Sequence, residues 1–197
     1  MPVYELSSAG SVKTGRTLYT SMNAGNQYGA MVPIASSIAT TSVVFSNIPQ
    51  TFQDLMLVMS LRSNRAATTA SFCTRINENT SGIGSYTILQ GDGSSASSSR
   101  NTGATFETFL SIAGNTSTSG IFSSVTYHLL NYTNSSTFKT CLARSANDLN
   151  GSGTTTLQVG LLRSTSPVTS LQLFEFDGNS MISGSTYTLY GIRAVSS

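Results

Sequence analysis

The sequence predicts an all-β protein, an antiparallel β-sandwich with an extended N-terminal arm. Three observations support this prediction. About ten short apolar segments recur at a spacing of roughly ten residues, Gly, Ser and Asn separate them, and no segment has apolar residues at helical steps of three and four. Short strands at regular spacing, with turn residues between them, are typical of sandwiches and barrels.

The first part of the chain differs from the rest. Residues 1–35 are expected to form the arm, and residues 36–197 the sandwich. Gly, Ala, Ser and Asn interrupt any regular period in the first segment, and its apolar residues are isolated. An arm that lies over another protein fits this pattern better than a floppy terminus, which usually carries fewer aromatic residues. The expected anchors of the arm on its partner are Tyr4, Leu18, Tyr19, Tyr28 and Met31.

The sandwich is expected to begin with a strand at 42–46, which an Asn-Ile-Pro turn ends. The next strand, 55–61, has apolar residues on both faces near its start. The remaining expected strands are 70–76, 85–90, 104–112, 121–130, 137–144, 154–162, 168–176 and 185–195, with a Gly/Ser loop at 91–100. The predicted core consists of Leu55, Leu57, Met59, Val125, Tyr127, Leu129, Leu157, Val159, Leu161, Leu173 and Leu189.

Charge is sparse along the whole chain. Charged residues make up 9% of it, the net charge is +2, and Ser and Thr together account for just under a third of the residues. The low net charge argues against a disordered, self-repelling coil. The basic residues are scattered, so no nucleic-acid-binding surface is expected. A weakly charged surface resists self-association poorly, which favours a protein that works inside an assembly.

The N-terminus, the longest apolar run and the cysteines indicate where the protein is made and whether it crosses a membrane. The N-terminus lacks the basic and apolar regions of a signal peptide, and the longest apolar run, 55–59, is too short to span a bilayer. We therefore expect a soluble product made in the cytoplasm, with no membrane partner. Cys73 and Cys141 could form one disulfide, but two buried free thiols are favoured.

No residue pattern points to catalysis, a metal or a cofactor, so the protein is expected not to be an enzyme. The single His128 has no acid and nucleophile at a recognisable spacing, and two distant cysteines with one histidine do not make a zinc site. The segment 148–153 begins like a calcium loop but lacks the bidentate Glu, so a hairpin connection is expected. Glu175 and Asp177 could form a glycosidase pair, although a turn at 177–179 explains Asp177 better.

Two stretches of the sandwich region carry a family resemblance. The first is SVVFSNIPQTFQDL at 42–55, which continues to LRS at 61–63. The second comprises GLLRS at 160–164, VTSL at 168–171 and GSTYTLYGI at 184–192. They resemble a group of structural proteins of tailed-bacteriophage virions, found especially in aquatic phages. The resemblance covers residues 40–197 and does not include the arm.

The resemblance implies a virion component with a jelly-roll-like sandwich, commonly oligomeric, and no catalytic residue. We expect a homo-oligomer, with a trimer favoured, that binds the major capsid protein or tail proteins. A capsid decoration (cement) protein would brace the head through its arm. A tail fibre or receptor-binding module would present its loops to a host surface glycan. Decoration is favoured because the chain has no coiled-coil or shaft repeat. A lectin-like or hydrolytic domain is disfavoured by the absence of Trp.

Overall fold

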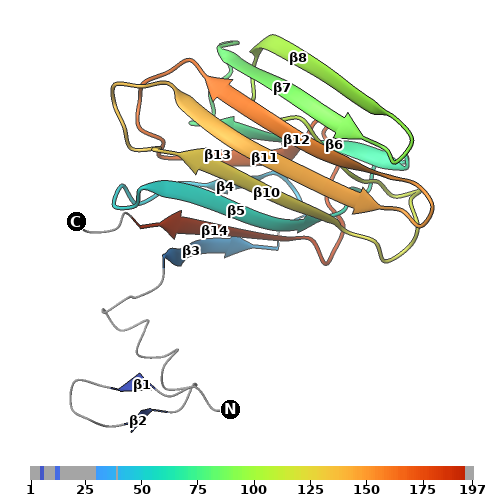
Figure 1. Cartoon of the computed structure of the whole chain (residues 1–197), viewed down its shortest axis with the longest axis horizontal. Coiled ribbons are helices and arrows are strands. Elements are labelled where there is room, and N and C mark those ends of the chain that lie inside the picture. Colours follow the sequence, from blue (N-terminus) through green and yellow to red (C-terminus); the bar gives the residue numbers. More distant parts are fainter. Residues whose placement is uncertain (1–4, 7–11, 14–29, 39, 194–197) are drawn as a thin grey trace.

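The computed structural model describes residues 5–6, 12–13, 30–38 and 40–193. Every regular element in these residues is a β-strand, as the sequence predicts (Figure 1). No helix in the described part of the chain could therefore cross a membrane. The strands are β1 (Glu5–Leu6), β2 (Val12–Lys13), β3 (Met31–Ser37), β4 (Val43–Phe45), β5 (Asp54–Leu61), β6 (Thr69–Ile76), β7 (Gly84–Gly91), β8 (Ala96–Ala104), β9 (Leu110–Ala113), β10 (Ser123–Leu130), β11 (Lys139–Asp148), β12 (Gly153–Leu162), β13 (Leu171–Glu175) and β14 (Thr186–Ile192).

Two antiparallel sheets pack face to face and form the predicted sandwich. The large sheet has eight strands in the order β3-β14-β5-β10-β11-β12-β7-β8, and the small sheet has four in the order β4-β13-β6-β9. β1 and β2 pair only with each other. In Figure 1 the large sheet faces the viewer, with β8 and β3 at its opposite edges and the small sheet behind it.

Strands from the two halves of the chain pair with each other. β5 pairs with β14, β6 with β13, and β7 with β12, so strands early in the chain lie beside strands late in the chain. The first and third of these pairs belong to the large sheet and the second to the small sheet. The chain therefore crosses between the layers as it proceeds.

The core lies between the two inner faces. Eight of the predicted core residues are buried there: Leu55, Leu57, Met59, Val125, Tyr127, Leu129, Leu173 and Leu189. The prediction is wrong for β12, because Leu157 and Val159 are 45% and 44% exposed and Leu161 is only half-buried. The inward face of β12 instead carries Thr156, Gln158, Gly160 and Leu162.

Three strands differ clearly from the expected boundaries. Of the strand expected at 104–112, only Leu110–Ala113 forms a strand, β9, and residues 105–109 link β8 to it. β8 occupies the second half of the segment predicted as a Gly/Ser loop, since its Ser-rich sequence gives no alternation of apolar residues. β3 begins at Met31 and pairs with β14, so the last five residues of the predicted arm belong to the large sheet. Cys73 and Cys141 are free and buried, as favoured from the sequence; Cys141 faces the core from β11, and Cys73 lies in a smaller cluster with Ala104 and Phe106.

Candidate assembly surface

The reversed face of β12 results from the segment 105–109, which links β8 to β9. This segment runs along the edge of β6, where Glu107 N donates to Thr74 O at 3.0 Å. The Glu107 side chain then reaches further along β6 and accepts a hydrogen bond from Ile76 N at 3.0 Å. Glu107 thereby supplies one of the acceptors that a neighbouring strand would offer to β6.

β12 contacts the segment 105–109 through the side chain of Gln158, which points inward. Gln158 is buried, and its Oε1 accepts a hydrogen bond from Phe109 N at 2.8 Å. Two residues on, Gly160 leaves no room for a side chain, since a Cβ there would collide with the carbonyl oxygen of Glu107 and the sulfur of Cys141. At these two inward positions only a polar or very small residue fits, so the neighbouring bulky residues Leu157 and Val159 point outward.

These residues join others on the outer face of the large sheet. Leu142 of β11 lies directly opposite Val159, and Leu89 of β7 lies opposite Leu157. The four side chains are 44% to 55% exposed. We call this set, Leu89, Leu142, Leu157 and Val159, the outer patch. It spans three adjacent strands, β11, β12 and β7, of which β7 neighbours the edge strand β8. A patch of clustered rather than scattered apolar residues is typical of a contact surface.

The surroundings of the outer patch are polar and nearly uncharged. Arg144, which lies opposite Leu157, donates from Nε to Thr126 Oγ1 at 2.8 Å. His128, opposite Leu142, contacts Asp54, with 3.3 Å between Nε2 and Oδ2. Two further basic residues, Arg62 and Lys139, are buried against backbone carbonyls and add nothing to the surface. Few charges would have to be desolvated when this face is covered.

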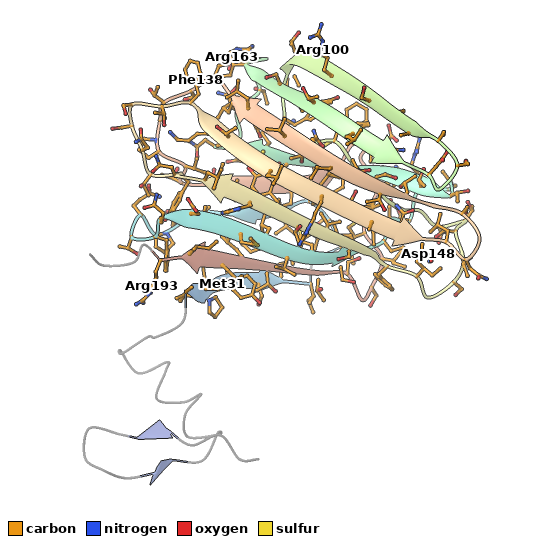
Figure 2. The ribbon with its side chains drawn as sticks, in the orientation of Figure 1. Met31, Arg100, Phe138, Asp148, Arg163 and Arg193 are labelled. Carbon is orange, nitrogen blue, oxygen red and sulfur yellow. The ribbon has the colours of Figure 1, made fainter. Side chains whose placement is uncertain are left out.

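The predicted arm anchors fall mostly beyond the described residues. Tyr4, Leu18, Tyr19 and Tyr28 lie outside them. Met31 opens β3 opposite Ile192 and is 44% exposed, at the edge of the large sheet away from β8 (Figure 2). The anchors as a group are therefore not brought together by the described structure.

Three kinds of side-chain group could in principle serve catalysis or metal binding: His128 with its partners, the pair Glu175 and Asp177, and clusters of His, Cys, Asp or Glu. In the described ranges, the hydrogen bonds of His128 include Asp54 but no Ser, Thr or Cys. Glu175 is buried and accepts from Asn179, whereas Asp177 pairs with Arg65 on the surface, so the two carboxylates have separate roles. No group of three or more His, Cys, Asp or Glu in the described residues could hold a metal ion.

The calcium-like segment forms the hairpin connection expected from the sequence. Asp148 Oδ1 accepts from Asn150 N at 2.9 Å, and Asn150 and Gly151 both have positive φ. The side chain of Asp148 thus closes the turn between β11 and β12, which is an ordinary use of Asp in a hairpin loop. This connection lies at the end of the sheet where Asp148 is labelled in Figure 2.

A second surface feature is a groove of about 250 Å³ beneath the β7–β8 hairpin. Its walls are Ile88 and Gln90 of β7, three serines of β8, and residues of β6 and β9 that include Ser71 and Ser111. Phe109 lies at one side and belongs to a group of rings with Tyr86, Phe106 and Phe176. Hydroxyl and amide groups beside an aromatic ring can bind a sugar.

The sequence predicts none of the outer-patch residues at a functional surface, although it contains one signal for this surface. On β11 the inward residues Cys141, Ala143 and Ser145 are small, while the outward Leu142 and Arg144 are large. A strand with small residues on one face and bulky ones on the other packs its small face closely against a neighbouring layer. Comparisons with known proteins give no further guide, since no family model, no curated protein and no solved structure matches this chain.

Proposed function

We propose that this protein is a structural subunit of a tailed-phage virion, and within that class a capsid decoration protein that works by assembly rather than by turnover. The outer patch is the observation that carries the proposal. Its four apolar side chains remain about half exposed in the isolated chain. Covering them fully would contribute on the order of 1 kcal/mol each, since complete burial of such a side chain contributes about 1.5–3 kcal/mol.

The assignment to a virion is supported by the sequence resemblance at 42–63 and 160–192. Sparse surface charge is consistent with it, because a subunit held in a lattice has less need of charge to stay dispersed. The proposed location is the mature particle, after synthesis in the host cytoplasm. The proposed partners are the major capsid protein and further copies of this chain.

Decoration is preferred over a tail fibre because the outer patch lies on a broad sheet face rather than at a tip. A broad face of eight strands suits contact with a surface lattice. The groove beneath β7 and β8 favours the alternative, a receptor-binding module, because its hydroxyl lining and Phe109 could hold a host glycan. The two functions place the protein at different parts of the particle.

The location is tested by imaging. Particles of the virus that encodes this chain would be purified, and the protein located by a small epitope tag and electron cryomicroscopy. Label over the head lattice is the expected result. Label confined to the tail would replace decoration with the fibre alternative. A purified, infectious particle that lacks the protein would refute the structural role altogether.

The role of the outer patch is tested by a matched pair of variants. Val159→Asp places a charge in the patch, whereas Val44→Asp places the same charge on β4 of the small sheet. The two valines are 44% and 43% exposed, so the effects on folding should be similar. We expect Val159→Asp to reduce incorporation into particles at least tenfold and Val44→Asp to leave it unchanged. Equal incorporation of both variants would exclude the patch as the contact surface.

A further inference from the structure

The large sheet ends in a long strand with one free edge. β8 pairs with β7 over Ala96–Ala104, and no other described residue hydrogen-bonds to its backbone. In an antiparallel strand, alternate residues point their N–H and C=O groups to opposite sides. Half of the backbone groups of β8 therefore face outward from the sheet, along its upper edge in Figure 1.

Within the described residues, β8 has few of the features that usually protect an edge. Proteins block such strands with Pro, Lys, bulges or a covering segment. Residues 96–103 are exposed, contain neither Pro nor Lys, and carry one charge, Arg100. The only irregularity of the β7–β8 pairing lies at one end, between Gly84 and Ser85. The ladder of outward N–H and C=O groups is therefore regular over most of the strand.

The other edges in the described structure are blocked or short. β3, at the opposite edge of the large sheet, contains Pro33, which has no N–H, and its pairing with β14 is interrupted by a bulge. β4 and β9, the edges of the small sheet, have three and four residues. Among the described strands, only β8 offers a long, uninterrupted row of backbone groups.

We propose that β8 pairs antiparallel with β8 of a second copy of this chain across a two-fold axis, so that two large sheets become one continuous sheet. A single open edge favours this geometry, because the same strand on both copies closes the assembly at two. A three-fold ring built by edge pairing would need a second open edge on each copy, and β3 does not provide one. The inference does not depend on where in the particle, or whether in a virion, the protein works.

The side chains of β8 favour one register. Arg100 lies on the outer face of the strand and projects from the upper edge in Figure 2, so a register with Arg100 opposite itself would place like charges together. A register centred on Ser99 instead places Arg100 opposite Ser98 of the second copy. It still pairs residues 96–102 of both strands, and the serines leave room for the neighbouring strand.

Cross-linking tests the pairing directly. In the full-length chain, Ser99→Cys would place two thiols opposite each other at the axis, while the native cysteines remain buried. Ser36→Cys, exposed on the opposite edge strand β3, is the control. We expect mild oxidation to convert most of the Ser99→Cys protein, and little of the control, to a disulfide-linked dimer. Equal cross-linking at both positions would overturn the proposal.

A charge at the axis gives an independent measurement. Ser99→Lys would set two ammonium groups against each other, and Ser124→Lys, on an exposed position of β10, is the control. By sedimentation equilibrium we expect the unmodified chain and the control to dimerise, and Ser99→Lys to weaken the dimer at least tenfold. A monomeric unmodified chain, or a dimer or trimer that Ser99→Lys leaves intact, would contradict β8–β8 pairing. Loss of the dimer on removal of residues 1–29 would also contradict the proposal. It would indicate that the N-terminal segment of a neighbouring copy, and not its β8, pairs with the edge of β8.

Discussion

At the scale of single residues, Leu157 and Gln158 show that alternation along a strand does not decide which of its two faces is buried. The period of two predicts that 157, 159 and 161 share one face, and they do. Hydrophobicity then assigns that face to the core, and this assignment is wrong. The deciding interactions are the hydrogen bond from Phe109 N to Gln158 and the close approach of Glu107 to Gly160. Both come from a segment some fifty residues away in sequence, so no local pattern contains them.

If hydrophobicity alone decided the orientation of β12, Leu157→Gln would destabilise the fold more than Gln158→Leu. The structure predicts the reverse order. Gln158→Leu would leave the buried N–H of Phe109 without its acceptor, at a cost of about 1–3 kcal/mol in the free energy of unfolding. Leu157→Gln, on the exposed face, should change it by less than about 0.5 kcal/mol. Urea unfolding measures both. A larger loss in Leu157→Gln than in Gln158→Leu would contradict the orientation of β12.

Glu107 is a buried carboxyl group whose ionisation opposes folding. Burial raises its pKa from 4.5 to about 8, against the opposing effects of the hydrogen bond from Ile76 N and of Arg75 nearby. Between these values the folded chain holds a proton that the unfolded chain releases. The free energy of unfolding should therefore fall as the pH rises from 4.5 to 8, by at most about 1.4 kcal/mol per pH unit.

Glu107→Gln should remove this pH dependence, because the amide oxygen can still accept from Ile76 N and the group no longer ionises. We expect the variant to be more stable than the unmodified chain at pH 8 and the two to converge towards pH 5. Chemical denaturation at a series of pH values gives the comparison. A variant that keeps the slope, or an unmodified chain that gains stability over this interval, would refute the assignment.

At the scale of elements, the sequence predicts most strands because their apolar residues alternate against a single core. β5 and β10 follow this pattern closely, and their inward residues are those predicted. β8 escapes prediction because neither face is buried, so its sequence of Ser, Arg, Asn and Thr has no apolar period. The candidate assembly surface escapes prediction for the opposite reason, because its residues are apolar and alternate. A face that would be buried only by a partner resembles a core face in the sequence of an isolated chain.

The packing of β12 against the segment 105–109 should tolerate no side chain at Gly160. Gly160→Ala would drive its Cβ against the backbone of Glu107, and we expect a loss of about 1–3 kcal/mol or a failure to fold. Gly91→Ala on β7 is the control, because its Cβ would meet only Ser95 O at 3.8 Å. Thermal unfolding followed by circular dichroism distinguishes them. Equal melting temperatures would show that the 105–109 segment is not held as described.

At the scale of the whole molecule, the sandwich has two surfaces that the described residues leave uncovered, the outer patch and the free edge of β8. They lie on the same sheet and can act together, since pairing of β8 across a two-fold axis would bring two outer patches onto one broad face. Two weak contacts on one rigid dimer bind a repeating surface more tightly than either alone. Dimerisation and attachment to a lattice are thus expected to support each other.

The N-terminal boundary of the sandwich can be tested by two deletions from the complete chain. β3 pairs with β14 from Met31 to Ser37, and its Ile34 and Ala35 pack against the core. Removal of residues 1–37 should therefore expose the edge of β14 and lower the melting temperature by about 5–10 °C. Removal of residues 1–29 spares this strand and should leave the melting temperature of the sandwich unchanged.

The shorter deletion isolates the proposed arm, with its expected anchors Tyr4, Leu18, Tyr19 and Tyr28. If these residues attach the subunit to the particle, the chain lacking residues 1–29 should still fold and dimerise through β8. The amount of it bound to particles should fall at least tenfold. Ordering such a segment costs roughly 1–2 kcal/mol per residue, so only several anchors acting together can make its attachment favourable. Full occupancy of the shortened chain on particles would leave the outer patch as the attachment surface and remove the arm from the proposal.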